Sequence, residues 1–343
     1  MPGSRLSTVA ELDELLSEPS PGAVEAIGRL DGDLVLLGVG GKMGPTLARM
    51  ARRATDLAGQ RRRIVGVSRF SDPAAADSLR AGGVEPMACD LLDTDQVAGL
   101  PDASNVVLMA GRKFGTTGQE HLTWATNTVV PALVCRRYRH SRIVAFSTGN
   151  VYGLSPVARG GSVETDPLRP VGEYANAALG RERTLEHFSR TLGIPMVLLR
   201  LNYATELRYG VLVDIARQVW AGVPVDVAMG QCNAIWQGDA NAMTLQAFDV
   251  VATPPAVLNI AGPELLSIRR VALTFGQLLG KTVTITGVEA ADALLSNAQR
   301  SHALFGYPRV PAARLMAWIA DWVRAGGADL GKPTHFASRD GQF

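Results

Sequence analysis

The stretch Leu34-Val35-Leu36-Leu37-Gly38-Val39-Gly40-Gly41-Lys42-Met43-Gly44 decides the fold. Its run of large apolar residues predicts a strand that is buried on both faces, and the pattern over Pro45–Arg53 predicts a helix. The glycines therefore stand where a strand passes directly into a helix. At such a junction the free backbone amides and the positive end of the helix dipole attract a phosphate, and a side chain would block its close approach. The order of strand, glycines and helix favours a dinucleotide site over an ordinary tight turn.

Short apolar runs alternate with longer stretches of helical periodicity in the following sequence. The predicted strands are Leu34–Val39, Ile64–Val67, Val106–Ala110, Ile143–Phe146 and Met196–Leu199, and the predicted crossover helices are Pro45–Arg53, Leu122–Tyr138 and Leu179–Leu192. Strands that are apolar throughout are typical of a parallel sheet covered by helices on both faces. We therefore predict an α/β fold, a doubly wound parallel-sheet Rossmann fold with a smaller C-terminal substrate-binding part.

Four parts of the chain are expected from this pattern. Residues 1–30 form an N-terminal helical extension, in which Thr8 and Glu11 make a capping box and a second short helix follows over Val24–Leu30. Residues 31–200 form the dinucleotide-binding Rossmann domain. Residues 201–325 form most of the substrate-binding part, with late strands and helices that return to the Rossmann domain. Residues 326–343 are polar and glycine-rich and are expected to be a loose tail.

The composition favours a soluble, cytoplasmic protein. Among 343 residues, 34 are basic and 32 are acidic, which argues against nucleic acid or a membrane as the main partner. We find no apolar run of membrane-spanning length and no hydrophobic signal core at the acidic N-terminus. The three cysteines, Cys89, Cys135 and Cys232, are scattered, which fits a reducing compartment. The five histidines form no HxH or HxxxH pair, so no metal site is expected.

The end of the second predicted strand bears on the choice of cofactor. In Rossmann folds that bind NAD, a carboxylate near this point binds the ribose 2′-hydroxyl. Here the strand runs into Ser68 and Arg69. A guanidinium can make paired charge-assisted hydrogen bonds to a 2′-phosphate, so the pair favours NADP over NAD. The alternative interpretation of Arg69 is an ordinary surface arginine that follows a strand.

At this point the sequence resembles the extended short-chain dehydrogenase/reductase family, the NAD-dependent epimerase/dehydratases that include UDP-galactose 4-epimerase. The resemblance covers roughly residues 32 to 325. It rests on the spacing Gly38-x-x-Gly41-x-x-Gly44, on Cys89–Asp93, Val107–Gly111, Asn127, Phe146–Gly153, Leu199–Tyr203, Gly238–Ala240 and Leu258–Gly262, and on a terminal helix around Trp318–Val323.

The resemblance implies the site residues. The residues implied to bind the cofactor are Gly38, Gly41, Lys42, Met43, Gly44, Ser68, Arg69, Asp90, Leu91, Ala110, Gly111, Lys113 and Asn127. Thr148 takes the position of the catalytic serine or threonine, whose hydroxyl hydrogen-bonds a substrate hydroxyl or carbonyl. Tyr174 takes the position of the catalytic tyrosine, which passes a proton to or from the substrate oxygen while hydride moves to or from the nicotinamide. The resemblance also implies a homodimer through the helices that bear Asn127 and Tyr174.

One residue departs from the family pattern. The family motif is Tyr-x-x-x-Lys, but here the stretch is Tyr174-Ala-Asn-Ala-Ala178. The missing lysine normally holds the nicotinamide ribose and lowers the pKa of the tyrosine. An unassisted phenol has a pKa near ~10, so about one in a thousand would be phenolate at pH 7. Lys113 is the expected replacement cation, because Arg181 lies two helical turns beyond Tyr174 and could reach it only by bending back.

The predicted substrate is small. Family members that act on nucleotide sugars commonly have a long segment after the Arg-x-x-Asn strand and an arginine that grips the diphosphate. Here Asn202 is soon followed by the helical pattern Val211–Ala221, and the stretch before Asp239 has no arginine. A buried diphosphate needs compensating charge, so we favour a smaller sugar, sugar acid or polyol over a UDP-sugar. The candidate pocket residues, each of which could equally be structural, are Asn202, Tyr203, Arg208 and Trp236, with Arg200 and Gln237 beside them.

These observations favour an NAD(P)-dependent epimerase/dehydratase-like oxidoreductase of carbohydrate metabolism, which acts on a sugar or sugar-acid hydroxyl or carbonyl by hydride transfer. They leave open whether the redox change is net or transient, as in an isomerase. Two alternatives stay beside this interpretation. One is a catalytically degenerate dinucleotide-binding sensor or regulatory protein, because the motif lysine is absent. The other is an enzyme in which a different catalytic group works beside the bound cofactor.

Overall fold

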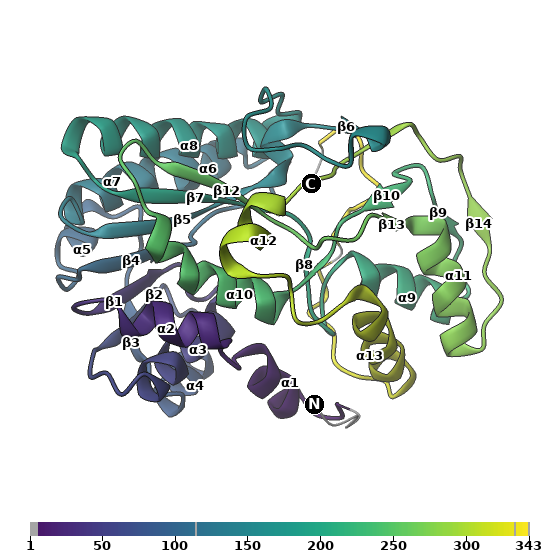
Figure 1. Cartoon of the computed structure of the whole chain (residues 1–343), viewed down its shortest axis with the longest axis horizontal. Coiled ribbons are helices and arrows are strands. Elements are labelled where there is room, and N and C mark those ends of the chain that lie inside the picture. The colour runs from purple at the N-terminus through teal and green to yellow at the C-terminus, as the bar shows by residue number, and fades with distance from the viewer. Residues whose placement is uncertain (1–5, 114, 333, 342–343) are drawn as a thin grey trace.

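The computed structural model describes residues 6–113, 115–332 and 334–341. At its centre lies a seven-stranded parallel sheet with the strand order β12-β7-β5-β4-β1-β2-β3 (Figure 1). The strands are β1 Leu34–Leu37, β2 Ile64–Ser68, β3 Glu85–Ala88, β4 Asn105–Leu108, β5 Arg142–Thr148, β7 Met196–Leu201 and β12 Ala256–Ile260. The strand order reverses at β1, and this confirms the prediction of a doubly wound α/β fold.

Helices cover both faces of this sheet. One layer contains α2 Pro21–Gly28, α3 Gly44–Leu57, α4 Pro73–Ala81 and α10 Gln237–Gln246, and the other contains α5 Thr94–Ala98, α6 Glu120–Trp124, α7 Val130–Arg137 and α8 Gly172–Leu192. Successive side chains of a strand point to opposite faces, so Leu34 and Leu36 pack in the core beneath α3 while Val35 and Leu37 pack in the core beneath α7 and α8. Because both faces are buried, the strands are apolar throughout.

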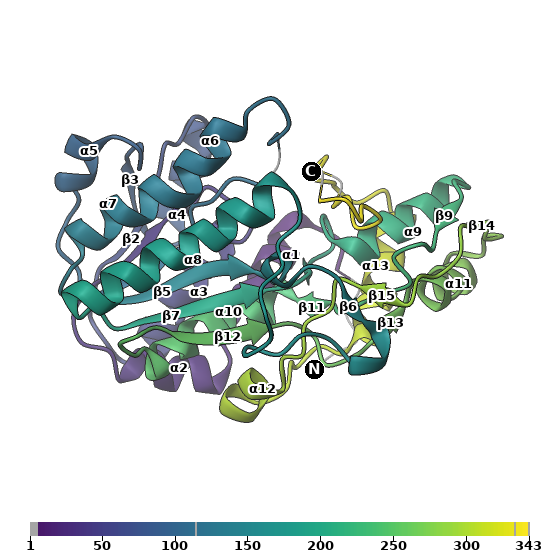
Figure 2. The ribbon, with the colours of Figure 1, turned by 90° about the horizontal axis from the view of Figure 1, so that it is seen from above.

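The C-terminal part packs beyond the carboxyl ends of the strands (Figures 1 and 2). Its helices α9 Val211–Ala221, α11 Ile268–Leu279 and α13 Ala312–Arg324 surround a core of their own that contains Trp236 and Trp322. Four short strand pairs join its loops: β8 Ala204–Thr205 with β11 Ile235–Trp236, β9 Val225–Asp226 with β14 Ile285–Thr286, β10 Gln231–Cys232 with β13 Leu266–Ser267, and β6 Ser155–Pro156 with β15 Asp292–Ala293. Helix α12 Gln299–Phe305 returns to the edge of the main sheet beside β12.

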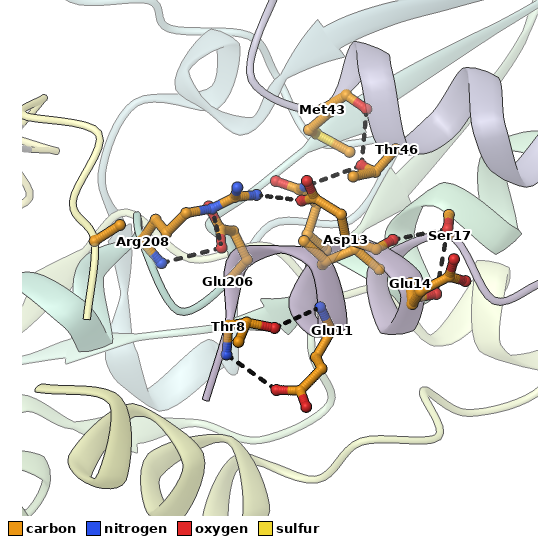
Figure 3. Close-up of polar contacts among 12 residues, drawn as sticks. Thr8, Glu11, Asp13, Glu14, Ser17, Met43, Thr46, Glu206 and Arg208 are labelled. Atoms are coloured by element: carbon orange, nitrogen blue, oxygen red, sulfur yellow. Dashed lines mark hydrogen bonds and ion pairs between the residues drawn. The ribbon is translucent and has the colours of Figure 1, made fainter. Parts of the chain in front are cut away.

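Helix α1 Val9–Leu16 connects the two parts. Its predicted capping box is confirmed, because the Thr8 side chain accepts from the Glu11 amide and Glu11 accepts from the Thr8 amide. Leu12 and Leu16 are fully buried in the core of the C-terminal part. Figure 3 shows Asp13 of α1 facing Arg208, and the Arg208 Nη2 to Asp13 Oδ1 distance is 2.9 Å. The second helix starts earlier than predicted, at Pro21, because Ser20 caps it and proline is favoured in the first turn.

Several predicted boundaries are corrected. Strand β1 ends at Leu37, before Val39, because Gly38 turns the chain with a φ of +92°, and strand β4 ends at Leu108, before Ala110. The helix predicted over Leu122–Tyr138 contains a π-helical turn over Ala125–Val129. Helix α8 begins at Gly172, seven residues before the predicted start at Leu179. Its first two turns bury small residues, Ala175, Ala177 and Ala178, which carry little of the apolar signal that marks an amphipathic helix.

The prediction of a loose C-terminal tail is wrong for the part that the structure describes. The Thr334 amide and hydroxyl both donate to Asp214 Oδ2, at 2.8 and 2.6 Å. Phe336 is only 6% exposed and packs in the C-terminal core. Arg339 forms an ion pair with Asp292. The partner of Thr334 lies more than a hundred positions earlier in the chain, and the partner of Arg339 lies about fifty positions earlier. Local composition therefore does not reveal that this segment is ordered.

The glycine turn gives a test of this packing. A Cβ at Gly44 would overlap the Val39 carbonyl, whereas a Cβ at Gly41 would meet only the Gly38 oxygen at 3.5 Å. We expect Gly44→Ala to lower the free energy of unfolding by about 2 kcal/mol or more, because backbone must move to make room. Gly41→Ala should change the stability by less than ~1 kcal/mol. Urea unfolding followed by circular dichroism measures both, and equal effects would contradict this account of the turn.

Candidate functional site

The glycine turn lies at the point where the order of the sheet reverses. Gly38 follows β1, and a Cβ there would lie 2.5 Å from the Ala110 amide nitrogen at the end of β4. Gly44 begins α3, whose first turn contains Pro45 and no acidic side chain. The turn thus brings the amino end of a fourteen-residue helix to the carboxyl edge of the sheet. Ligands of open α/β sheets bind in this crevice, and a helix amino end attracts anions.

The ends of β2 and β3 adjoin the same turn. The Ser68 side chain occupies the space that a Cβ at Gly40 would need, so its hydroxyl faces the turn. Arg69, the next residue, is exposed. Asp90 follows β3, its amide donates to Gln96 Oε1 at 2.9 Å, and its own Oδ1 accepts from the Leu92 amide at 3.0 Å. The structure therefore brings Gly38, Ser68, Asp90 and Leu91 to one edge of the sheet, as the sequence predicted.

Thr148 and Tyr174 meet at the end of β5. Thr148 is the last residue of the strand, and its Oγ1 accepts from the Asn150 amide at 3.2 Å. Tyr174 lies in the first turn of α8 and shares a hydrogen bond with the Thr148 side chain. Burial raises the pKa of Tyr174, while the charge of Arg181 and the hydrogen bond to Thr148 oppose that rise. The two predicted catalytic hydroxyls are thus adjacent.

Arg181 bends back toward Tyr174. Its side chain is only 6% exposed, Nη1 donates to the Phe146 carbonyl at 2.8 Å, and Nη2 donates to Asn127 Oδ1. A Cβ at Gly111 would overlap that guanidinium, so the absence of a side chain at Gly111 leaves the space that Arg181 occupies. The charge of Arg181 lowers the pKa of Tyr174, so Arg181 meets the condition under which the sequence analysis allowed it to act on the tyrosine. Helix spacing does not reveal the direction that this long side chain takes.

Asn127 lies inside the π-helical turn Ala125–Val129. Its Nδ2 donates to the Thr123 and Arg112 carbonyls, at 2.9 and 3.1 Å, while its Oδ1 accepts from Arg181. A side chain that bonds to a carbonyl one turn earlier widens the helix, and π-helical turns are frequent at functional sites. Asn127 therefore holds the loop after β4 and the Arg181 guanidinium in place together.

Two lysine side chains, Lys42 and Lys113, lie against tyrosine rings in this part of the molecule. The Lys42 Nζ lies 3.1 Å from the centroid of the Tyr209 ring, and the Lys113 Nζ lies 5.8 Å from the centroid of the Tyr174 ring. Burial, together with the charges of Lys113 and Lys332, lowers the pKa of Lys42 to about 7. Burial also lowers the pKa of Lys113 to about 8. The charge of Lys113 therefore acts on Lys42, so the two lysines lie in one part of the site.

A pocket lies between the segments that carry Thr148 and Tyr174 and the C-terminal part of the chain. Its lining includes Lys113, Asn150 and Val171, together with Ser338 and Arg339 of the C-terminal segment. Asn150 comes two residues after Thr148, and Val171 comes three residues before Tyr174. The pocket is therefore lined by near neighbours in sequence of the two hydroxyl-bearing residues.

The model of the NAD dependent epimerase/dehydratase family matches residues 34–204. The chain belongs to this family. Its matched region contains the glycine turn, Asn127, Thr148 and Tyr174. Where the resemblance implies a lysine, the chain has Ala178, which is buried against Val151 and Tyr152. The charge of Arg181 acts on Tyr174.

Solved structures of epimerases and dehydratases share the fold at low sequence identity. UDP-glucuronic acid 4-epimerase from Bacillus cereus, in complex with UDP-glucuronic acid and NAD, aligns with a TM-score of 0.70 and 18% identity over 85% of this chain and 99% of its own. UDP-glucose 4-epimerase from Thermus thermophilus, in complex with NAD, aligns at 0.68 and 19% over 86% and 99%. dTDP-glucose 4,6-dehydratase from Bacillus anthracis, in complex with NAD, aligns at 0.70 and 16% over 85% and 96%. No curated protein matches this chain in sequence.

The four candidate substrate residues lie in different surroundings. Tyr203 lines the pocket, and Asn202 packs beside Gly149 with its Nδ2 donating to the Leu294 carbonyl at 3.4 Å. Arg208 is engaged by Glu206, at 3.0 Å, and by Asp13 of α1 (Figure 3). Trp236 is 1% exposed in the C-terminal core and contacts Trp318 edge-on. The structure thus places Tyr203 and Asn202 near the pocket, Arg208 in an ion-pair cluster and Trp236 in the core.

A buried network of polar side chains lies next to Thr148 and Tyr174 and joins helix α8 to the sheet. Arg200 and Glu182 form an ion pair at 2.7 Å, Arg200 Nη1 donates to Tyr152 Oη at 2.8 Å, and Tyr152 Oη donates to Asn259 Oδ1 at 2.7 Å. Glu182 comes from α8, Tyr152 from the turn after β5, Arg200 from β7 and Asn259 from β12. This network fixes the helix that bears Tyr174 against three segments of the sheet. It explains why Arg200 is structural rather than part of the pocket.

Other kinds of site find no support in the described residues. No group of three or more His, Cys, Asp or Glu side chains among them is placed to hold a metal. Within the same ranges, no helix is long and apolar enough to cross a membrane. Burial raises the pKa of both Cys135 and Cys232 to about 12, which makes these thiols poor nucleophiles.

Lys42 provides a pH-dependent test. Below pH 7 Lys42 is charged in both the folded and the unfolded protein, so the folded state bears the full cost of its burial, and that cost disappears as pH rises toward the unfolded pKa of about 10.5. We expect Lys42→Met to be more stable than the wild type by about 1–3 kcal/mol at pH 6 and by much less at pH 10. Urea unfolding across this pH range measures the difference.

The matched control is Lys281→Met. Lys281 is exposed, and its Nζ lies 4.6 Å from the centroid of the Trp220 ring. Its substitution removes the same charge from an exposed position, so it shows the effect of losing a lysine without the cost of burial. If the difference in stability between Lys42→Met and the wild type did not change with pH, this result would contradict the claim that Lys42 carries a buried charge.

Proposed function

We propose that the protein is an NAD(P)-dependent oxidoreductase of the epimerase/dehydratase type, which acts on a hydroxyl or carbonyl of a sugar-like substrate by hydride transfer. The observation that carries this proposal is the hydrogen bond between Thr148 and Tyr174 at the carboxyl edge of the sheet, beside the glycine turn and within reach of the Arg181 charge. Solved epimerases and dehydratases of the same fold, in complex with NAD, support it.

The residues at the edge of the sheet fit a nicotinamide dinucleotide. The space next to Gly41 is open, since a Cβ there would meet only one atom within 4 Å, and the start of α3 directs free amides toward it. The diphosphate would lie on Gly38, Gly41, Lys42, Met43 and Gly44, the adenosine would lie near Ser68, Arg69, Asp90 and Leu91, and the nicotinamide end would lie near Ala110, Lys113, Asn127 and Tyr174. The exposed Arg69 beside Ser68 favours NADP over NAD, because its guanidinium can pair with a 2′-phosphate.

When bound, this cofactor would accept or donate the hydride. Tyr174 then passes a proton to or from the substrate oxygen, and Thr148 orients that oxygen by a hydrogen bond. Because burial raises its pKa, Tyr174 is a neutral phenol near pH 7, which suits proton donation to a carbonyl that is being reduced. For the reverse direction the buried Arg181 stabilises the phenolate, which is the electrostatic task of the missing lysine. Lys113, 5.8 Å from the Tyr174 ring, faces the pocket and can bind the ribose or the substrate.

We propose that the two hydrophobic cores correspond to two binding roles. Residues 31–200 hold the cofactor, and residues 201–325 contribute most of the substrate site, with Asn202 and Tyr203 nearest to it. We leave Trp236 out of the site because it is buried in the core, and Arg208 because it is engaged by Asp13 and Glu206. A homodimer through the helices that carry Asn127 and Tyr174 remains part of the proposal.

Tyr174→Phe tests the proposed catalytic role. The substitution removes the proton-transfer group while the ring stays, so we expect turnover to fall by about 10²–10⁴-fold with cofactor affinity unchanged. Calorimetric titration with NAD(H) and NADP(H) measures the affinity, and nicotinamide fluorescence measures turnover of a sugar, sugar-acid and polyol panel. Tighter binding of NADP(H) is expected, and an equal or weaker affinity would overturn the preference for NADP.

The control for this substitution is Tyr307→Phe, because Tyr307 is 69% exposed. Turnover that survives Tyr174→Phe would favour a different catalytic group. Cofactor binding with no turnover across the panel would favour a sensor or regulatory protein.

Arg181→Met tests the replacement of the lysine. Without the buried cation the phenolate form of Tyr174 loses its support, so we expect oxidation of a hydroxyl to slow by about tenfold or more and its pH profile to move to higher pH. Gly111→Ala should have a similar but weaker effect, because the new methyl group displaces the guanidinium. The readout is the pH dependence of kcat, with Arg183→Met as the control at an exposed ion pair of the same helix. An unshifted profile in Arg181→Met would contradict the role.

A further inference from the structure

We infer that His335, in the C-terminal segment 334–341, belongs to the active site and binds a hydroxyl group of the substrate. The inference rests on the proposed function for the reaction at Tyr174. It adds a substrate-binding residue that lies outside residues 34–204, which the family model matches. Three observations carry it: the place of His335 in the pocket, the way its backbone is held, and the state of its imidazole.

His335 lines the pocket from the C-terminal segment. Asn150 and Tyr203 line the same pocket. Asn150 comes two residues after Thr148, and Tyr203 directly follows Asn202. The lining therefore joins His335 to the segment of the catalytic hydroxyl and to the segment that we expect to contact substrate.

The segment that bears His335 also reaches the helix of Tyr174. A Cβ at Gly172 would overlap the Gly341 carbonyl, and a Cβ at Gly341 would overlap the Val171 carbonyl, so the two backbones are in direct contact. Gly172 is the first residue of α8 and stands two residues before Tyr174. The segment therefore runs from the C-terminal part to the start of the catalytic helix, with His335 along this path (Figure 2).

The backbone of His335 is left-handed, with a φ of +55°. This conformation is uncommon outside glycine, although histidine adopts it more readily than most residues, and residues held in it cluster at ligand sites. Among the residues that the structure describes, the other non-glycine positions with a positive φ are Phe70 and Tyr203. Two of these three positions, Tyr203 and His335, therefore meet at one pocket.

The neighbours of His335 hold its backbone in place. Thr334 is 2% exposed and donates twice to Asp214, while Phe336 is buried in the C-terminal core. The Ser338 amide donates to the His335 carbonyl at 3.0 Å. His335 itself is exposed, between two buried residues. Its position is thus fixed by side chains other than its own, so the fold does not need the imidazole.

The His335 imidazole is available to a ligand. Within residues 6–113, 115–332 and 334–341 it makes no hydrogen bond and no ion pair. A neutral imidazole has one donor and one acceptor nitrogen, which matches a hydroxyl group, because a hydroxyl also both donates and accepts. Thr148 and Tyr174 serve the reacting oxygen under the proposed function. We therefore assign to His335 a hydroxyl at another carbon of the sugar-like substrate.

His335→Asn tests this assignment. Asparagine also adopts the left-handed conformation readily, so the substitution keeps the backbone and removes the imidazole. For the compound of the sugar, sugar-acid and polyol panel that the wild type turns over fastest, we expect KM to rise by about tenfold or more while kcat changes by less than ~threefold. The physical reason is that a hydroxyl away from the reacting carbon is bound equally in the ground state and the transition state. The melting temperature should stay within about 2 °C of the wild type.

The matched control is His140→Asn. His140 is exposed and precedes β5, which begins at Arg142, so it lies at the edge of the sheet opposite to Thr148. This substitution should leave KM and kcat unchanged. An unchanged KM in a folded His335→Asn protein would overturn the inference. A fall in kcat at unchanged KM would overturn it as well, because His335 would then act on the reacting atoms.

Chemical modification of the wild-type protein gives a second test, which needs no substitution. Diethyl pyrocarbonate modifies accessible imidazoles, and peptide mass spectrometry identifies the modified residue. We expect His335 to react, and its reaction to slow by about tenfold when the same compound is present at ten times its Kd. His140 should react at one rate in both states, and His302, which is buried with Nε2 3.0 Å from the Ala261 carbonyl, should react slowly. A rate for His335 that the compound does not change would contradict the assignment.

The inference and the proposed function fail in different ways. If a panel compound is turned over with the same KM by the wild type and by His335→Asn, the inference fails and the proposed function stands. If no compound is turned over, but one binds in calorimetry and His335→Asn weakens its Kd by about tenfold, the proposed function fails and the role of His335 stands. If no compound of the panel binds, both are overturned.

Discussion

A guanidinium buried between α8 and β5 is the constraint on which the site depends. Arg181 donates to the Phe146 carbonyl and to Asn127, so one charged group joins the strand that ends at Thr148, the π-helical turn and the helix that begins beside Tyr174. Burial lowers the pKa of Arg181, which shows that the charge is costly there, and the charges of Tyr174 and Glu182 oppose that effect. A cost of this kind is typical of functional sites, where charge is kept in a position that the reaction needs.

Several positions surround the place where the resemblance implies a lysine. Ala178 stands there and packs against Val151 and Tyr152. Gly111 leaves room for Arg181, and Asn127 accepts from it. Under the proposed function, Arg181 would support the phenolate of Tyr174, and Lys113 would contact the ligand, because the Arg181 guanidinium already donates to two protein groups.

Helix α1 and the segment 334–341 both join the part that contains the seven-stranded sheet to the C-terminal part. Helix α1 contributes Leu12 and Leu16 to the C-terminal core, while its Glu14 pairs with Arg49 and Arg53 of α3. The segment 334–341 runs from α9 to the start of α8. Most of these ion pairs are partly exposed and individually weak, so the apolar side chains Leu12, Leu16 and Phe336 supply most of the attachment.

The sequence by itself determined five of the seven strands of the sheet, the glycine turn, and the placing of Thr148 after a strand, because each depends on neighbours within a few residues: an apolar run, a glycine at a tight turn, or a short motif. The capping box at Thr8 was predictable for the same reason. The outer strands β3 and β12 were not among the predicted strands. The fold-back of Arg181, the convergence of Lys42 and Lys113, the burial of Trp236 and the course of the C-terminal segment were decided only by the tertiary structure. Each of these depends on residues that lie far apart in the sequence, and the packing of the sheet and its helices sets the distance between them. A long side chain such as that of Arg181 can adopt several directions, and only the packing of its neighbours selects one.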